Sequence, residues 1–459
     1  MTTKFDAIII GSGQSGPSLA ERFAKNGQKV AVIERSNFGG TCVNTGCVPT
    51  KTYVASAYVA HMARRAAEYG VDIGDTVKVD MKQVKARKDA IVTKSRDGVT
   101  KWMAGLEHGK VYRGHALFTG PKTISVNNES LEADRIFINT GGRASVPEIQ
   151  GLETVPYLTN SSLLDLDFVP EHLIVIGGSY IGLEFAQAFR RFGSRVTVVE
   201  MSDRLIARED ADVSDAVREI LAAEGIDVRL NAKCLAVEKN GNSISVGLDC
   251  AAGAPQVSGS HLLLAVGRKP NTDDLGLDKA GILTDPKGFI TVDDQCRTNV
   301  EGVWAIGDVN GRGAFTHTSY NDFEIVAANL FDNDPRKISD RIPCYGLFID
   351  PPLGRVGMTE KEVKAKGIKA LVAKRLMTSI GRARERGETQ GFMKVVIEDE
   401  TKKILGAAIL GINGDEVVHA FLDVMSIGAP YTAISRAMHI HPTVAEYLPT
   451  LLEDLKSLY

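Results

Sequence analysis

Cysteine is scarce in this sequence, with six residues among 459, and only Cys42 and Cys47 are close neighbours. A disulfide-rich secreted scaffold is therefore excluded. In a cytosolic chain, a close pair of this kind is more often catalytic or metal-binding than structural. Zinc would need two further ligands, commonly from a second close pair, and the other cysteines form none, so we expect no metal site.

Long apolar runs and an excess of basic residues are also missing. No run approaches the roughly 20 apolar residues that span a bilayer, and a net charge of -3 offers no basic surface for nucleic acid. The N-terminus enters an apolar run at Phe5 without the features of a signal peptide. We therefore expect a cytoplasmic protein with small-molecule partners and no membrane or nucleic-acid role.

The length is enough for about three domains, and the first stretch has the pattern of a dinucleotide-binding unit. An apolar strand, Phe5–Ile10, leads into a turn with Gly11, Gly13 and Gly16, then a helix and a second strand that ends at Glu34. Such a turn lets a pyrophosphate approach the backbone at a helix N-terminus, and the acid can accept hydrogen bonds from a ribose.

The same order of elements returns in the middle of the chain. A strand at 172–176 leads into a turn with Gly177 and Gly182, and the acid Glu200 follows the first glycine at the same separation as in the first copy. Ser179 replaces the middle glycine, which makes approach to a phosphate less free. The carboxylate of Glu200 would repel a 2′-phosphate, so NAD is favoured over NADP, although Arg204 could weaken this preference.

Beyond about residue 340 the pattern of expected elements changes. Residues 391–398 and 403–410 are expected as strands, and 415–426, 431–438 and 444–459 as helices. An α+β module therefore follows the two nucleotide-binding units. Residues 81–106 are expected as a long amphipathic helix that covers the first domain.

The cysteine pair lies in Gly39-Gly40-Thr41-Cys42-Val43-Asn44-Thr45-Gly46-Cys47-Val48-Pro49-Thr50-Lys51, directly after the first unit. Two thiols separated by four residues can close a small ring, and a flavin on the nucleotide gives them a redox partner. The segment closely resembles the redox-active disulfide motif of the class I pyridine nucleotide-disulfide oxidoreductases with FAD, the group of dihydrolipoamide dehydrogenase, glutathione reductase and mercuric reductase.

This resemblance covers essentially the whole chain and implies an α/β fold with two Rossmann-like dinucleotide-binding domains and a C-terminal α+β dimerisation domain. The FAD-binding domain would comprise residues 1–149 and 274–340, the NAD(P)-binding domain 150–273 and the dimerisation domain 341–459.

The resemblance also implies roles for single residues. Cys47 is the thiol nearest the flavin, and Cys42 is the interchange thiol that meets the substrate. Lys51 approaches the flavin N5 and pairs with Glu184, as a semi-buried ammonium needs a counter-charge. Tyr180 resembles the tyrosine that covers the nicotinamide pocket until the cofactor displaces it, with plain packing as the alternative.

Thr140–Arg143 resembles the strand-end turn that closes the family's first FAD segment, and 303–308 resembles the second FAD fingerprint, which ends at an aspartate that holds the ribityl chain. Residues 265–271 match the stretch that leaves the family's NAD domain and locate a domain boundary. The FAD residues implied are Gly11, Gly13, Gly16, Glu34, Thr41, Lys51, Thr140, Gly141 and Asp308. The NAD residues implied are Gly177, Tyr180, Gly182, Glu200 and Gly267.

A histidine near the C-terminus, His441, is followed five residues later by Glu446. A histidine that titrates near neutral pH suits proton exchange with Cys42, and a carboxylate can orient its ring. The pair matches the family's catalytic dyad, which reaches the disulfide of the other subunit, so a homodimer with shared active sites is implied. His439 has no assigned role.

The implied reaction passes electrons from NAD(P)H through FAD to the Cys42–Cys47 disulfide and on to a thiol, disulfide or metal-ion acceptor. Residues 343–360 and 380–384 resemble mercuric-reductase-like flavoproteins, and Arg382 and Arg384 either bind an anionic substrate or are solvated charges. The residues 455–459 lack mercuric reductase's C-terminal cysteine pair, so we do not expect Hg(II) delivery by that route. The alternatives are dihydrolipoamide dehydrogenase and, from another class, an NADH oxidase or quinone reductase with non-essential cysteines.

Overall fold

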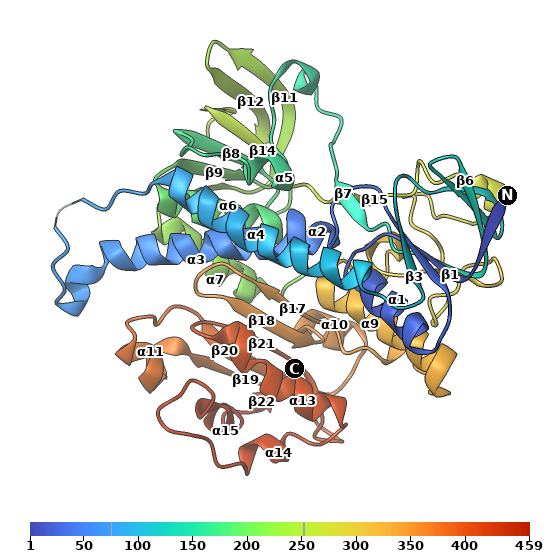
Figure 1. The fold of residues 1–459 in the computed structure, drawn as a ribbon. Coiled ribbons are helices and arrows are strands. Elements are labelled where there is room, and N and C mark those ends of the chain that lie inside the picture. The colour runs from blue at the N-terminus through green and yellow to red at the C-terminus, as the bar shows by residue number, and fades with distance from the viewer. Residues whose placement is uncertain (75, 251–252) are drawn as a thin grey trace.

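A computed structural model describes residues 1–74, 76–250 and 253–459. Figure 1 shows three groups of elements. The blue N-terminal strands lie on the right, the green strands from the middle of the chain at the top, and the orange and red strands at the bottom. No helix within the described ranges combines the length and apolar character needed to cross a membrane.

The N-terminal sheet has the strand order β3-β2-β1-β6-β5-β4, with β16 also paired to β6. Its strands are β1 (Thr2–Ile10), β2 (Val30–Glu34), β3 (Gly109–Arg113), β4 (Leu117–Gly120), β5 (Thr123–Val126), β6 (Glu129–Ile138) and β16 (Val303–Ala305). Ala7 and Ile9 of β1 join one apolar cluster, whereas Ile8 and Ile10 join another. The continuous apolar run of β1 therefore reflects burial on both faces of a sheet whose central strands are parallel.

Helices cover this sheet and carry the cysteine segment. They are α1 (Ser15–Lys25), α2 (Gly40–Asn44), α3 (Cys47–Arg64), η1 (Ala66–Tyr69), α4 (Met81–Ala104), η3 (Asp308–Asn310), α9 (Thr316–Ala327), η4 (Ala328–Asp332) and η5 (Ile338–Asp340). The long helix expected at 81–106 is α4, and Asp80 caps it by accepting hydrogen bonds from the N–H groups of Lys82 and Gln83.

The middle of the chain forms a parallel sheet of order β10-β9-β8-β14 and an antiparallel sheet of order β11-β12-β13. The strands are β8 (His172–Ile176), β9 (Arg195–Val199), β10 (Asp227–Arg229), β11 (Ala232–Asn240), β12 (Ser243–Cys250), β13 (Gln256–Gly259) and β14 (His261–Leu264). The helices here are η2 (Leu152–Thr154), α5 (Asn160–Leu163), α6 (Tyr180–Phe192) and α7 (Ala211–Ala223). The short helix α8 (Leu277–Ala280) instead packs against β4 in the core of the N-terminal sheet. A separate pair, β7 (Gly142–Ala144) and β15 (Arg268–Pro270), lies between this part and the N-terminal sheet.

The C-terminal part is an antiparallel sheet of order β17-β18-β21-β20-β19-β22 with short helices. Its strands are β17 (Cys344–Leu347), β18 (Leu353–Gly357), β19 (Ala370–Leu376), β20 (Phe392–Glu398), β21 (Ile404–Leu410) and β22 (Lys456–Ser457). Its helices are α10 (Glu360–Ala365), η6 (Met377–Ser379), α11 (Gly381–Glu385), α12 (Gly414–Val417), α13 (His419–Ser426), α14 (Thr432–Ser435) and α15 (Tyr447–Leu451). The expected fold class, two Rossmann-like units followed by an α+β part, is confirmed.

The C-terminal helices differ from those expected. The helix at 415–426 is broken into α12 and α13, the one at 431–438 shrinks to α14, and most of 444–459 is not helical. The apolar residues Leu448, Leu451 and Leu452 are buried in the core of the C-terminal part, so their spacing reflects packing and not a long helix. The tail instead forms β22, which pairs with the otherwise open edge of β19.

Candidate active site

One cavity of about 1780 Å³ is lined by residues from all three parts of the molecule. Its wall includes both glycine turns, both acids that follow them, and Cys42 and Cys47. The volume exceeds the roughly 300–1,000 Å³ of a site for one drug-sized ligand. The cavity can therefore hold two extended dinucleotides with the cysteine pair beside them.

The two glycine turns repeat each other in atomic detail. Gly11 and Gly177 have φ angles of 105° and 113°. A Cβ on Gly11 would lie 2.3 Å from the carbonyl oxygen of Asn139, and one on Gly177 would lie 2.4 Å from that of Ala265. Each first glycine is therefore required by a close approach to the chain that follows the neighbouring strand.

The first turn fits a bound pyrophosphate. A Cβ on Gly13 would approach no closer than 3.4 Å, to the Asn139 side chain, so packing within the protein does not require glycine there. Gln14, which caps α1, makes no side-chain hydrogen bond to the helix. A phosphate could approach the backbone through the space that the absent side chain of Gly13 leaves, and it could accept hydrogen bonds from the free N–H groups. The residues of this turn therefore fit FAD.

The acids after the two units have matching hydrogen bonds. Glu34 accepts from the backbone N–H groups of Ser12 at 3.0 Å and Ser36 at 2.8 Å. Glu200 accepts from those of Gly178 at 2.6 Å and Ser202 at 2.8 Å. Each acid thus holds its own glycine turn while it faces the cavity.

Arg204, which could have weakened the preference of Glu200 for NAD, forms an ion pair with Asp203 at 3.0 Å. Arg204 is not among the residues that line the cavity. A different cation, Arg208, lines the cavity near Tyr180. Sequence reasoning missed Arg208 because it lies in an irregular loop without a recognisable motif.

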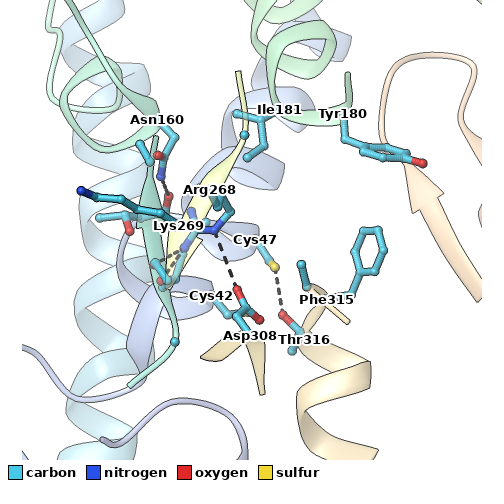
Figure 2. Close-up of a pocket in the computed structure, with 18 of the residues that line it drawn as sticks. Cys42, Cys47, Asn160, Tyr180, Ile181, Arg268, Lys269, Asp308, Phe315 and Thr316 are labelled. Carbon is cyan, nitrogen blue, oxygen red and sulfur yellow. Dashed lines mark hydrogen bonds and ion pairs between the residues drawn. The ribbon is translucent and has the colours of Figure 1, made fainter. Parts of the chain in front are cut away.

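Cys42 lies in α2, and Cys47 begins α3, where the positive end of the helix dipole favours an anion. Both are free thiols in this structure, which therefore describes the reduced state of the pair. A hydrogen bond between the sulfurs lowers the pKa of Cys47 to about 6 and raises the pKa of Cys42. Burial opposes the lowering, whereas Thr316, whose Oγ1 lies 3.2 Å from the Cys47 sulfur, and Lys51 favour it (Figure 2).

Lys51 and Glu184 meet as the resemblance implied, with Nζ 2.7 Å from Oε2. Glu184 is only 5% exposed at its side chain, and its other oxygen accepts from the backbone N–H of Phe348 at 3.0 Å. The Lys51 ammonium also lies over the Phe348 ring, 4.4 Å from its centroid. The ion pair joins α3 to α6, and the contacts of both residues with Phe348 add the segment after β17.

The residues expected to bind FAD near the end of β6 and in η3 come together across the β7–β15 pair. The hydroxyl of Thr140 donates to the Asn271 carbonyl at 2.8 Å, and Arg268 reaches both Thr41, at 3.4 Å, and Asp308, at 3.8 Å (Figure 2). Burial raises the pKa of Asp308, although Arg268 opposes the rise. A half-buried carboxylate with one distant cation can accept hydrogen bonds from ligand hydroxyls, which fits a ribityl chain.

Gly141, Gly182 and Gly267 also line the cavity wall or support it. Gly141 and Gly267 line it with φ angles of 64° and 121°. Gly182 lies in α6, where a Cβ would approach the Gly177 carbonyl oxygen to 2.2 Å. Tyr180 begins α6 and lies across from Phe315 (Figure 2).

His441 and Glu446 meet each other but not the cysteine pair. Nδ1 lies 2.8 Å from the carboxylate, the His441 side chain is 82% exposed, and neither residue lines the cavity. Met438 and Ile440 beside them are 100% and 79% exposed. Neighbouring exposed apolar side chains of this kind are typical of an interaction surface.

The arginines left open by the sequence lie outside the cavity wall. Arg382 pairs with Glu385 at 3.1 Å in α11, and Arg384 is exposed. His439 is half-buried, with its Nδ1 3.1 Å from the carbonyl oxygen of Ala437. The geometry gives none of the three a contact with the cavity.

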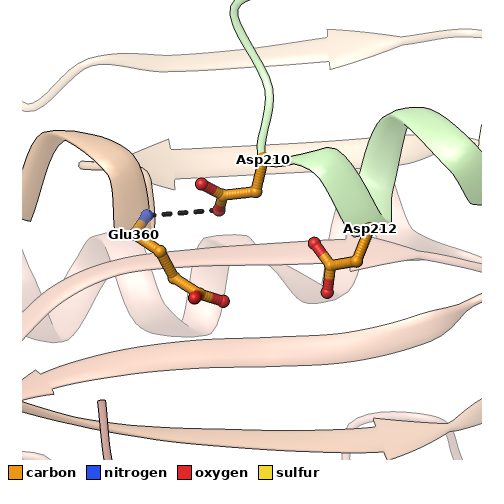
Figure 3. A group of neighbouring side chains, drawn as sticks. All are labelled: Asp210, Asp212 and Glu360. Carbon is orange, nitrogen blue, oxygen red and sulfur yellow. Dashed lines mark hydrogen bonds between the residues drawn. The ribbon is translucent and has the colours of Figure 1, made fainter. Parts of the chain in front are cut away.

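Asp210, Asp212 and Glu360 place carboxylate oxygens within 4.8 Å of one another (Figure 3). The ammonium of Lys394 lies 3.0, 2.7 and 2.9 Å from these three carboxylates. A lysine thus supplies the positive charge that the cluster needs, so the cluster gives no support for a metal site.

Comparison with known proteins places these features in context. The family model of pyridine nucleotide-disulphide oxidoreductases matches residues 5–322, and that of the family's dimerisation domain matches residues 344–452. The probable pyridine nucleotide-disulfide oxidoreductase RclA of Escherichia coli is 36% identical over 462 residues, which cover 99% of this chain and 100% of that protein.

Two other relatives are enzymes with different names. Mercuric reductase of Staphylococcus aureus is 34% identical and covers 97% of this chain and 81% of its own length. Dihydrolipoyl dehydrogenase of Chlorobaculum parvum is 34% identical and covers 97% of this chain and 96% of its own length. Among solved structures, the Cu(II) complex of the HOCl-induced flavoprotein disulfide reductase RclA from Escherichia coli matches with a TM-score of 0.90 and 34% identity, covering 98% of this chain and 99% of that one.

Proposed function

Because this chain belongs to the class I pyridine nucleotide-disulfide oxidoreductase family, we propose that it takes electrons from NADH and delivers them through Cys42 and Cys47 to a small thiophilic acceptor. The family is one of oxidoreductases that use FAD and NAD(P)H. The observation that carries the proposal is the lowered pKa of Cys47 in a cavity shared by two nucleotide-binding turns.

FAD, when bound, supplies two-electron chemistry between the nicotinamide and the cysteine pair. The chain's own residues bind the cofactor and adjust the charge around the Cys47 sulfur. Gly13 would leave room for the pyrophosphate, Glu34 would accept hydrogen bonds from the ribose, and Asp308 would accept them from the ribityl hydroxyls. Lys51 places a positive charge beside the Cys47 sulfur, and Glu184 compensates that charge.

The reduced pair can transfer two electrons to a disulfide by exchange. The sulfur of Cys42 attacks one acceptor sulfur, a mixed disulfide forms, and the first acceptor thiolate leaves. The Cys47 thiolate then attacks the Cys42 sulfur, which closes the Cys42–Cys47 disulfide and releases the second thiolate. For a metal acceptor, two Cu(II) ions would each gain one electron as the same disulfide closes and the thiol proton is released.

The first attack needs a base because the pKa of Cys42 is raised. Within one chain, His441 lies outside the cavity. We propose that His441 of a second copy, oriented by its Glu446, removes the Cys42 proton in a homodimer with shared active sites. The match to the dimerisation domain supports this arrangement.

A thiophilic metal ion, Cu(II) or Hg(II), is the acceptor we favour. RclA aligns over its full length and has been solved as a Cu(II) complex, and the mercuric reductases align over 97% of this chain. The dihydrolipoyl dehydrogenase match, at 34% identity over 96% of that protein, makes dihydrolipoamide chemistry the second candidate.

An acceptor panel tests the proposal on FAD-loaded enzyme without oxygen. NADH oxidation is followed with Cu(II), Hg(II), lipoamide, glutathione disulfide and a quinone, for the native chain and for Cys42→Ser, Cys47→Ser and Cys250→Ser. We expect turnover with a metal ion or a disulfide that both pair variants abolish and Cys250→Ser retains. Cys250 lies outside the cavity wall.

The opposite result identifies the other class of enzyme. If Cys42→Ser keeps full turnover with every acceptor, the protein is a flavin oxidase or quinone reductase and the pair is a bystander. A two-electron titration with NADH gives a second readout. The long-wavelength absorbance of a thiolate beside oxidised flavin is expected, and its absence from FAD-replete protein contradicts the proposal.

We propose NADH as the electron donor because Glu200 faces the cavity at the position that would contact the adenosine ribose. The test compares kcat/KM for NADH and NADPH. A tenfold or greater preference for NADPH would contradict the assignment.

A further inference from the structure

Three aromatic rings pack together in the wall of the cavity. The ring of Tyr180 meets Tyr345 edge to face, with centroids 5.4 Å apart and planes at 75°. It also meets Phe315 edge to face, at 5.9 Å and 83°. Tyr345 and Phe315 are stacked on each other at 5.8 Å and 12°. The Tyr180 ring is thus held by two rings that are nearly parallel.

Tyr345 is anchored from behind by a buried ion pair. Its hydroxyl donates to Glu209, and Arg355 donates to the same carboxylate through Nε, at 3.0 Å from Oε2. The side chains of Glu209 and Arg355 are 0% and 1% exposed. Tyr345 and Arg355 are directly opposite each other in β17 and β18, so their side chains share one face of the sheet.

The anchor connects two parts of the molecule beneath Tyr180. Glu209 belongs to the loop before α7, and its N–H donates to the carbonyl of Ile206 at 2.8 Å. Ile206 in turn donates to the carbonyl of Gly178, in the turn that carries Tyr180, at 2.8 Å. Tyr345 comes from the C-terminal sheet. Glu209 is therefore linked both to the turn that carries Tyr180 and to Tyr345, so the two tyrosines are held at a defined distance.

We propose that Tyr345 is a positioning residue, a fixed stop that holds Tyr180 in the closed position and so sets how tightly the nicotinamide dinucleotide binds. This inference rests on the proposed role of Tyr180 as the residue that the nicotinamide displaces. Opening must break the contacts of Tyr180 with Tyr345 and Phe315. Weaker contacts make opening easier, so a looser stop gives tighter binding.

The test measures the Kd of NAD⁺ for oxidised, FAD-loaded enzyme by calorimetry, since NAD⁺ does not react with oxidised flavin. Tyr345→Leu keeps an apolar side chain but removes the edge-to-face contact and the hydroxyl. We expect NAD⁺ to bind about two- to tenfold more tightly, the range that one aromatic pair provides. Tyr345→Phe keeps the ring and loses only the hydrogen bond to Glu209, so its Kd for NAD⁺ should lie between those of the native protein and Tyr345→Leu.

A double-mutant cycle with Tyr180→Ala separates this stop from a general effect on folding. Tyr345→Leu should leave the Kd unchanged when Tyr180 is already absent. Tyr320→Leu is the matched control, because Tyr320 forms a similar edge-to-face pair with Phe323, at 5.2 Å, outside the cavity wall. It should bind NAD⁺ as the native protein does.

Three results would overturn the inference: no change in either Tyr345 variant, weaker binding in them, or an equal change with and without Tyr180. The proposed role of Tyr180 fails separately. If Tyr180→Ala itself leaves the Kd of NAD⁺ unchanged, Tyr180 is not the displaced residue, and the stop has nothing to hold. If Tyr180→Ala tightens binding and Tyr345→Leu does not, only the stop is wrong.

Discussion

Cys47 receives stabilisation for its negative charge from residues that are far apart in the sequence. Cys42 and Lys51 belong to the same motif, so the sequence alone suggests that they act on this sulfur. Thr316 is 269 positions away and starts a helix without any pattern that marks it. Only the fold shows that its hydroxyl meets the sulfur, which is why sequence reasoning missed it.

Removing the hydrogen bond from Cys42 should raise the pKa of Cys47, because that bond is the largest of the effects that lower it. In reduced protein, the rate at which iodoacetamide alkylates Cys47 follows the thiolate fraction and should rise with pH through a midpoint of about 6. Cys42→Ala should move this midpoint to higher pH. Mass spectrometry of the Cys47 peptide measures the rate.

Cys42→Ser is the matched control, since its hydroxyl can still donate to the thiolate and should keep the midpoint near that of the native protein. Thr316→Val should raise the midpoint less than Cys42→Ala does. Equal midpoints in Cys42→Ala and Cys42→Ser would contradict the assigned hydrogen bond.

Among the elements, α6 shows both the strength and the limit of sequence reasoning. The bounds of β8, the strand before α6, agree with those expected, because an apolar run that ends at a glycine turn leaves little choice. The sequence does not show that Glu184, Gln187 and Arg191 on one side of α6 are buried. Their partners in the segment 348–350 are more than 150 positions away, so no local period predicts the contact.

Gln187→Leu should destabilise the protein, because the Gln187 amide both donates to and accepts from the backbone of Asp350, at 2.8 and 2.7 Å. The variant leaves these buried groups unpaired at a cost of about 1–3 kcal/mol. Urea unfolding followed by circular dichroism measures the loss.

The control for this prediction is Gln83→Leu, at an exposed position in the first turn of α4. Its midpoint of urea unfolding should equal that of the native protein. If both glutamine variants behave alike, α6 is not held by the 348–350 segment.

At the scale of the molecule, Lys394 connects parts that the sequence presents separately. It lies in β20 of the C-terminal sheet, whereas Asp210 and Asp212 lie at the start of α7. Its side chain is 1% exposed. The sequence predicts three domains from repeats and composition, but it does not predict which charged residues become buried where the domains meet.

Lys394→Met should destabilise the protein by about 3–5 kcal/mol, because it leaves the buried Asp210 and the half-buried Asp212 and Glu360 without their counter-charge. Although burial opposes the effect, Lys394 and other donors lower the pKa values of Asp210 and Asp212. Their contribution is present above the unfolded pKa of about 4 and is lost as pH falls through the lower folded pKa values. The difference between variant and native protein in urea should therefore shrink below about pH 4.

Lys402→Met is the control, since Lys402 pairs with Asp399 at the surface, where an ion pair contributes about 0–1 kcal/mol. A loss as small as this for Lys394→Met would show that the buried network does not connect the two parts.

Sharing of active sites between subunits can be tested by mixing two inactive variants. Cys47→Ser and His441→Ala should each be inactive as homodimers. Unfolded together and refolded, they form heterodimers in which one site has an intact cysteine pair and an intact histidine. A random mixture should recover about a quarter of native turnover if each site draws on both subunits. No recovery, with dimers verified by light scattering, would contradict shared sites.

The matching hydrogen bonds of Glu34 and Glu200 have a consequence for protein engineering. A designer who wants this enzyme to accept NADPH would first replace Glu200 by arginine. That exchange also removes the carboxylate that accepts from Gly178 and Ser202, so the turn loses its internal brace together with its selectivity. A successful redesign must therefore supply a new acceptor for those two N–H groups in the same round of mutations. In a library varied at position 200 alone, a substitution that favours NADPH would be lost because the turn is destabilised.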